Sequence, residues 1–126
     1  MHLALGQVPV ILGNINENLK IMESAIKDAK TKTKENIDLI AFPELFITGY
    51  NLRDNYHSVA EIIPSNSNLQ EKMLALAKKH NVTILTGMVE RANKSLFNSA
   101  IMIGPEGYIG HCRKQYLPNF GPFEEK

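Results

Sequence analysis

Two charged side chains, Glu44 and Lys114, stand at the ends of apolar segments and are of types that can do chemistry. Glu44 follows Pro43 at the carboxyl end of an apolar stretch, the edge at which open α/β sheets place their sites. We expect partial desolvation to raise the pKa of this carboxyl group toward the range of a general base. The alternative is an ordinary strand-end glutamate that points into water or caps a loop.

Lys114 lies near the end of another apolar stretch. A lysine beside a carboxylate can stabilise an oxyanion or orient an acyl group, and the alternative is a lysine that faces solvent. Cys112 precedes Lys114 by two residues and would share its strand face. A neighbouring ammonium would lower the thiol pKa and make Cys112 more reactive. The alternative for Cys112 is a small, buried apolar residue.

Neither a metal site nor a cofactor is expected. The histidines are scattered, and none has metal-ligand spacing with Cys112 or with another histidine. Neither the dinucleotide-binding nor the P-loop glycine pattern occurs, so the glycine-containing turns are not phosphate loops. The histidines are His2, His57, His80 and His111.

Composition excludes several classes of protein. The 126 residues suit one domain, 1–126, and 44% hydrophobic with 21% charged residues is close to the globular average. A net charge of +1 offers no footprint for nucleic acid or an anionic membrane. One cysteine permits no internal disulfide, and no apolar run reaches membrane-spanning length. A soluble cytoplasmic protein is therefore the expectation.

The first half of the chain predicts a strand, a helix and a second strand. Residues 2–8 are apolar on both faces, which is typical of a buried strand. Asn14 and Glu17 resemble a capping box, and the apolar positions that follow have helical spacing. Residues 38–44 form another apolar strand, so a βαβ unit with parallel strands is expected. The helical apolar positions are Ile15, Leu19, Met22, Ile26 and Ala29.

The second half predicts a loop with one helical turn, a helix and three strands. Ser67 and Gln70 form a second capping-box pair, ahead of apolar positions with helical spacing. Pro105 and Gly107 suit a tight turn that makes the last two strands an antiparallel hairpin. The whole is an α/β layer with a mixed sheet and two helices. Its last three strands are residues 81–91, 95–104 and 107–114.

Three blocks in this order resemble the carbon–nitrogen hydrolase, or nitrilase/amidase, family. They are "AFPELFITGY" (41–50), "CRKQYLP" (112–118) and "NFGPFEEK" (119–126). Within the family, "YLPNFGPFEEK" (116–126) is most similar to the glutamine-hydrolysing domain of glutamine-dependent NAD synthetases and to stand-alone amidases. The resemblance implies an αββα sandwich, of which this chain supplies about one α/β layer.

The resemblance also implies roles for individual residues. Glu44 matches the general base that acts on a cysteine thiol, and Lys114 matches the lysine that stabilises the tetrahedral intermediate. Glu124 matches a second, positioning glutamate, with Glu125 as a neighbouring candidate. Tyr50 falls where the family lines its substrate pocket. The implied substrate is a small amide or nitrile, and the chemistry is hydrolysis of a non-peptide C–N bond.

The resemblance does not assign the nucleophile to Cys112. The family's cysteine lies on a strand-to-helix turn downstream of the lysine block, whereas Cys112 precedes Lys114. We therefore expect 1–126 to be the N-terminal part of the domain and inactive alone, or else a non-catalytic assembly remnant of the fold. A single layer would expose an apolar sheet face, so homo-oligomerisation is expected.

Overall fold

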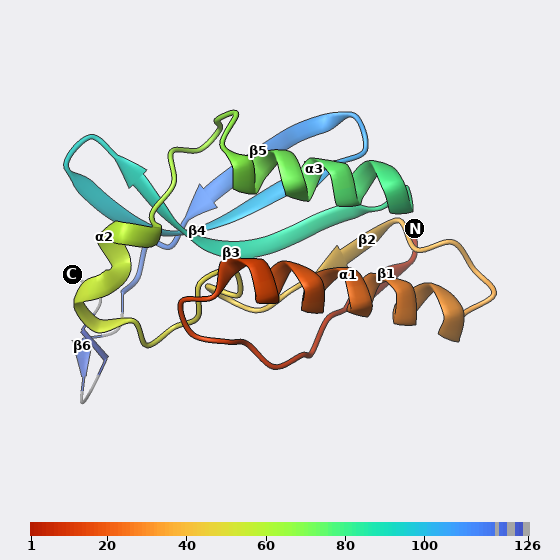
Figure 1. Ribbon diagram of the computed structural model, residues 1–126, viewed down its shortest axis with the longest axis horizontal. Coiled ribbons are helices and arrows are strands. Elements are labelled where there is room, and N and C mark those ends of the chain that lie inside the picture. The colour runs from red at the N-terminus through yellow and green to blue at the C-terminus, as the bar shows by residue number, and fades with distance from the viewer. Residues whose placement is uncertain (118, 121–122, 125–126) are drawn as a thin grey trace.

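The computed structural model describes residues 1–117, 119–120 and 123–124. Within them, β1 to β5 form one sheet in the order β1-β2-β3-β4-β5, and β6 pairs with β7 (Figure 1). In chain order the elements are β1 (Leu3–Leu5), α1 (Ile15–Lys32), β2 (Leu39–Ala41), η1 (Arg53–Asn55, a 3₁₀ turn), α2 (Tyr56–Val59), α3 (Asn68–His80), β3 (Thr83–Ala92), β4 (Ser95–Gly104), β5 (Gly107–Arg113), β6 (Asn119–Phe120) and β7 (Phe123–Glu124).

The large sheet is mixed, as the sequence predicts. The strands β1, β2 and β3 are parallel, with Ile40 of β2 aligned between Ala4 and Ile84. The strands β3, β4 and β5 are antiparallel to their neighbours. The β4–β5 turn contains Pro105, and Gly104 pairs with Gly107, whose φ is 132°. The carboxyl ends of β2, β3 and β5 and the start of β4 therefore share one edge of the sheet.

The helices α1 and α3 lie side by side across one face of the sheet (Figure 1). Their apolar sides meet the sheet in one continuous core. Every apolar position predicted to recur along α1 packs in or against this core. Its fully buried members include Met22, Ile26, Ile40, Met73, Ile84 and Ile101.

Both long helices begin where their capping residues predict. The Asn14 side chain accepts a hydrogen bond from the Glu17 amide at 3.2 Å. The Ser67 hydroxyl accepts one from the Gln70 amide, also at 3.2 Å. Each cap satisfies a backbone donor that has no partner inside its helix. The helix α3 ends at Asn81, which adopts the left-handed conformation that terminates many helices.

The first strand corrects the expectation of a strand buried on both faces. Leu3 is 55% exposed and Leu5 is 77% exposed, whereas Ala4 packs against the core. Because successive side chains alternate across a strand, both leucines lie on the face that carries no helices. The strand is also short and at the sheet edge, and the face opposite the helices is open there, as a single α/β layer requires.

Two further short strands, β6 and β7, follow β5. The strands β6 and β7 pair through Asn119 with Glu124 and Phe120 with Phe123.

Across the described residues, no helix combines the length and apolar character needed to cross a membrane.

Candidate active site

The chain turns sharply directly after β2, and this turn positions Glu44. Leu45 has a φ of 49°, in the left-handed region that is uncommon for a residue with a side chain of this size. The Phe46 amide donates to the Pro43 carbonyl at 3.2 Å, and the Gly49 amide donates to the Leu45 carbonyl at 2.7 Å. The turn therefore holds Glu44 at the carboxyl edge of the sheet.

Gly87 of β3 leaves the space in which this turn sits. A Cβ atom on Gly87 would lie 2.2 Å from the Leu45 nitrogen and 2.9 Å from the Glu44 Cα. The backbone around Glu44 thus passes directly over β3, where any other residue would collide with it. As β3 lies between β2 and β4, the close approach lets Glu44 reach side chains beyond β3.

A buried asparagine anchors the far end of the same turn. The Asn18 side chain of α1 is fully buried and donates hydrogen bonds to the carbonyls of Ile11 and Ile47, at 2.8 and 3.0 Å. Its oxygen accepts the Ile11 amide at 2.8 Å. One amide side chain therefore ties helix α1 to both loops beside the site.

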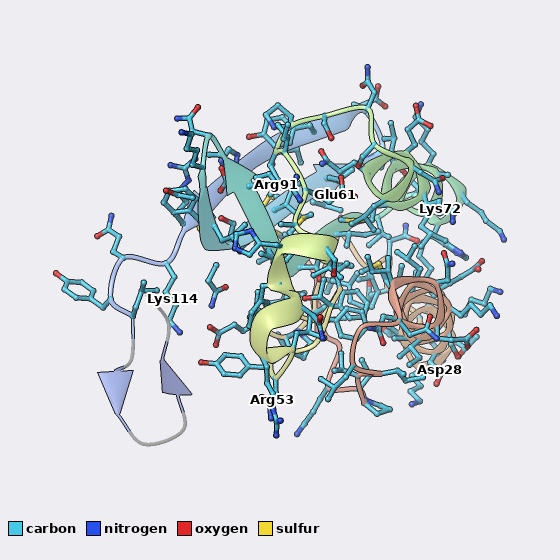
Figure 2. The ribbon with its side chains drawn as sticks, turned by 60° about the vertical axis from the view of Figure 1, so that its left-hand side comes forward. Asp28, Arg53, Glu61, Lys72, Arg91 and Lys114 are labelled. Atoms are coloured by element: carbon cyan, nitrogen blue, oxygen red, sulfur yellow. The ribbon has the colours of Figure 1, made fainter. Side chains whose placement is uncertain are left out.

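Two nitrogen donors converge on one oxygen of Glu44. The Lys114 Nζ lies 2.7 Å from Glu44 Oε1, and the Asn98 Nδ2 lies 2.6 Å from the same oxygen. Asn98 belongs to β4 and Lys114 follows β5, so three segments meet here. Figure 2 shows Lys114 where the chain leaves the large sheet toward β6 and β7. We refer to Asn98 and Lys114 as the donor pair.

The contacts of Glu44 correct the raised pKa that the sequence predicts for this residue. Burial raises the pKa of Glu44, as expected, but the hydrogen bonds from Lys114 and Asn98 and the charge of Lys114 together outweigh it. The net pKa of Glu44 lies below its ordinary value. The carboxyl group is therefore ionised at neutral pH and able to accept a proton. Both side chains remain partly exposed, Glu44 by 47% and Lys114 by 32%.

The remaining predicted site residues stand as follows. Cys112 is exposed, which corrects the alternative of a buried apolar residue, and it pairs with Ala100 in the β4–β5 ladder. Tyr50 is half-buried and follows the Glu44 turn in the same loop. Glu124 lies in β7, and nothing further is described of its side chain. Glu125 lies outside the described residues.

The sequence reasoning missed Asn98. Its signal is an amide in the middle of the apolar segment "LFNSAIMIG", since asparagine is depleted in strands. Recognising Asn98 as a partner of Glu44 requires the order of β2, β3 and β4, because 54 residues separate the two in sequence.

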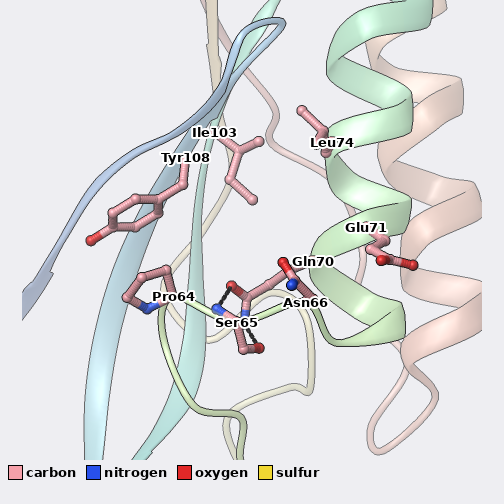
Figure 3. Close-up of a pocket in the computed structure, with 8 residues that line it drawn as sticks. All are labelled: Pro64, Ser65, Asn66, Gln70, Glu71, Leu74, Ile103 and Tyr108. Atoms are coloured by element: carbon pink, nitrogen blue, oxygen red, sulfur yellow. Dashed lines mark hydrogen bonds between the residues drawn. The ribbon is translucent and has the colours of Figure 1, made fainter.

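A pocket of about 350 Å³ lies away from the donor pair, between the start of α3 and the β4–β5 hairpin (Figure 3). Its polar centre is Gln70, which accepts the Ser65 amide at 2.9 Å and donates to the Ile62 carbonyl at 2.7 Å. These contacts hold the loop before α3 in place. The hydrogen-bonding groups of Gln70 therefore serve the structure of this loop.

The fold and the sequence both define the class of this protein. The family model for carbon–nitrogen hydrolases matches residues 2–126. The chain therefore belongs to the carbon–nitrogen hydrolase family, as its resemblance to that family implies.

Individual relatives agree with this assignment. A nitrilase from Pyrococcus abyssi is 35% identical over 104 residues, which are 81% of this chain and 38% of the nitrilase. A glutamine-dependent NAD(+) synthetase from Thermotoga maritima is 29% identical over 126 residues, or 100% of this chain and 21% of that protein. The chain thus spans between about a fifth and two fifths of the length of these two relatives.

A solved structure supports the predicted fold. The crystal structure of an N-terminal amidase matches 93% of this chain with a TM-score of 0.77 and 25% identity, and the matched part is 28% of that chain. The mixed five-stranded sheet with its helices is thus one α/β layer of the nitrilase fold.

Proposed function

We propose that this chain carries the general base and the oxyanion-stabilising lysine of an amide hydrolase. The observation that carries the proposal is the 2.7 Å contact between Lys114 Nζ and Glu44 Oε1 at the carboxyl edge of the sheet. Membership of the carbon–nitrogen hydrolase family supports it.

The proposed reaction uses Glu44 as a proton carrier. Glu44 accepts the proton of a cysteine thiol, and the thiolate attacks the amide carbonyl carbon. The carbonyl oxygen becomes an oxyanion, and the fixed positive charge of Lys114 stabilises it. Protonated Glu44 then gives its proton to the leaving nitrogen as the C–N bond breaks, which releases ammonia and leaves a thioester. Water, deprotonated by Glu44, hydrolyses the thioester to a carboxylic acid and regenerates the thiol.

The charges of the described site fit the first step. The lowered pKa keeps Glu44 ionised near neutral pH, which is the form that accepts a proton, while the same contacts make it a weaker base. Lys114 sits on the same carboxylate oxygen as Asn98. When Glu44 takes a proton, its attraction for Lys114 weakens, and the lysine charge is then available to the oxyanion.

We propose that the nucleophile is not Cys112. This residue is the one cysteine of the 126, and its place before Lys114 differs from that of the family's nucleophile. The test is ammonia release by the 126-residue chain from glutamine, an aliphatic amide and a nitrile. We expect turnover no higher than that of Cys112→Ser. Ammonia release that Cys112→Ser abolishes would overturn this assignment.

For the substrate we propose the side-chain amide of glutamine or a similarly small amide. The support is the similarity to glutamine-dependent NAD(+) synthetases along at least 98% of this chain and to a 2-oxoglutaramate amidase from Bacillus subtilis. The test is competition between glutamine and a nitrile for the product of the complete reading frame. Faster conversion of the nitrile would reject the amide and leave the class of hydrolase intact.

We also propose that the isolated chain self-associates through the sheet face that carries Leu3 and Leu5. These side chains are large, apolar and exposed, and an uncovered apolar sheet face favours burial against another surface. Light scattering at micromolar concentration tests this. We expect a dimer or larger species, reduced in Leu5→Lys; a folded monomer would contradict it.

A further inference from the structure

A second glutamate, Glu90 of β3, lies buried on the core side of the sheet. Its side chain is 2% exposed. The Ser99 hydroxyl donates to Oε2 of Glu90 at 2.6 Å. Arg113 donates to both carboxylate oxygens, from Nη2 to Oε1 at 2.5 Å and from Nε to Oε2 at 3.0 Å. A buried carboxylate is thus held by a two-pronged arginine contact, the strongest geometry for such a pair.

Arg113 is held on its other side by an aromatic ring. Its guanidinium carbon lies 3.9 Å from the centre of the Phe97 ring. His111, from the same strand as Arg113, places its Nε2 3.7 Å from Glu90 Oε1. The contact with Arg113 is the largest cause of the lowered pKa of Glu90, and it also raises the pKa of Arg113. Glu90 and Arg113 are therefore both charged, and their side chains are held in one orientation.

The partners of Glu90 are the immediate chain neighbours of the donor pair. Ser99 and Arg113 face each other in the β4–β5 ladder, and each adjoins one member of the donor pair. The Lys114 amide donates to the Asn98 carbonyl at 2.8 Å, which extends the ladder by one residue. Since side chains alternate along a strand, one face presents the contacts to Glu90 and the opposite face presents the donor pair.

We propose that Glu90 is a positioning residue for the donor pair. By holding Ser99 and Arg113 on the core side, Glu90 fixes the end of β5 against the start of β4. This register points Lys114 at the Glu44 carboxylate on the other side of the sheet. This inference rests on the proposed function only for the reason why Lys114 must be positioned. The geometric link between Glu90 and Lys114 does not depend on which reaction the site performs.

Stability alone is a weak reason for this pair. The buried carboxylate of Glu90 loses its hydration on folding, whereas the side chain of Arg113 stays 43% exposed, and apolar residues often stabilise a protein as well as a buried charge does. A two-pronged arginine contact, however, fixes the orientation of the two side chains more strictly than apolar packing does. Because Arg113 directly precedes Lys114, a fixed orientation of Arg113 also restricts the direction in which Lys114 points.

The test is the pKa of the Glu44 carboxyl group in the folded chain, measured by carbon-13 NMR titration. In Glu90→Gln we expect that pKa to rise, in the same direction as in Lys114→Met and by less. The direct effect of the substitution has the opposite sign. Removing the negative charge of Glu90, and leaving Arg113 unneutralised, lowers the pKa of a nearby carboxyl group. A rise therefore reports displacement of the donor pair.

Two further variants complete the test. Arg113→Lys keeps the positive charge but loses the two-pronged contact and the stacking on Phe97, so the pKa of Glu44 should rise here too. This variant decides the matter if Glu90→Gln does not fold. Glu23→Gln is the matched control, since it removes a carboxylate that pairs with Lys79 on the helices, and it should leave the Glu44 pKa unchanged.

A Glu44 pKa that is unchanged or lower in the folded Glu90 or Arg113 variant would overturn the proposal. That result would leave the proposed function untouched, because it concerns only what positions Lys114. Conversely, a raised Glu44 pKa together with a complete gene product that hydrolyses no amide would sustain the positioning role and reject the function.

Discussion

Asn98 and Lys114 donate to the same oxygen of Glu44 while joined to each other through the backbone. The Lys114 amide donates to the Asn98 carbonyl at 2.8 Å, and their side-chain nitrogens lie 2.6 and 2.7 Å from Glu44 Oε1. The two donors therefore move together with the β4–β5 ladder. Any change that shifts the end of β5 is expected to reach Glu44 through both contacts.

Lys114→Met should raise the pKa of Glu44. The substitution removes a hydrogen bond and a positive charge that both lower this pKa, whereas the burial that raises it remains. Carbon-13 NMR titration measures the shift. Lys20→Met, which removes the partner of Glu17 on α1, is the control and should leave the pKa of Glu44 unchanged. Equal titration of Glu44 in the wild type and Lys114→Met would contradict the contact.

Gly87→Ala should destabilise the chain and disturb the Glu44 turn. The added Cβ would lie 2.2 Å from the Leu45 nitrogen, which is backbone and cannot rotate away. We expect a loss of about 1–3 kcal/mol in the free energy of unfolding, as for an overpacked core. Gly110→Ala in β5 is the matched control, since its Cβ would meet nothing within 4 Å. Urea denaturation compares the two, and equal stabilities would count against the close approach.

Thr86→Val should leave stability unchanged or raise it by up to about 1 kcal/mol, because the substitution removes a polar group that is buried without compensation. Within the described part of the chain, the buried Thr86 hydroxyl has no hydrogen-bond partner. Thr48→Val is the comparison, since the buried Thr48 hydroxyl donates to the Gly49 carbonyl at 3.3 Å. Thermal unfolding should rank Thr86→Val above Thr48→Val, and the reverse order would be inconsistent with an unsatisfied hydroxyl.

The pairing of α1 with α3 should weaken in acid through Glu23. Hydrogen bonds from Lys79 and His80, with a further contribution from Lys27, lower the pKa of Glu23 from 4.5 to about 2. A carboxyl group whose pKa is lower in the folded state stabilises the fold fully above its unfolded pKa. The stabilisation declines as the pH falls from 4.5 and is lost below about 2.

The measurement is the free energy of unfolding of the wild type and Glu23→Gln between pH 7 and pH 2. Their difference should shrink as the pH falls through this range. Glu17→Gln, which removes an exposed ion pair with Lys20 on the same helix, is the comparison variant, since exposed ion pairs contribute little to stability. A constant difference between wild type and Glu23→Gln would show that the contacts of Glu23 do not link α1 to α3.

Local signals in the sequence were enough to predict the helices. The caps at Asn14 and Ser67 are short-range patterns, and the structure has both hydrogen bonds. The parallel pairing of β1 with β2 follows from the intervening helix. The prediction that β1 is buried on both faces was wrong, because an apolar strand looks the same in sequence whether both of its faces are covered or only one.

The site was less accessible to sequence reasoning because it depends on register. Glu44 and Lys114 are 70 residues apart, and only their resemblance to a family brought them together before the structure did. The lowered pKa of Glu44 depends on Asn98, and the support for Lys114 depends on Glu90. Neither partner is adjacent in sequence, so their roles appear only once β3, β4 and β5 are aligned.

In the proposed function, Glu44 and Lys114 act together on an amide. The most direct test is ammonia release from glutamine by the product of the complete reading frame, with Glu44→Gln and Lys114→Met compared against Glu23→Gln and Lys20→Met. We predict that each site variant loses at least about 100-fold in kcat, the scale of losing a general base or an oxyanion donor, while both controls keep wild-type rates. Site variants that hydrolyse the amide as fast as the controls would contradict the claim.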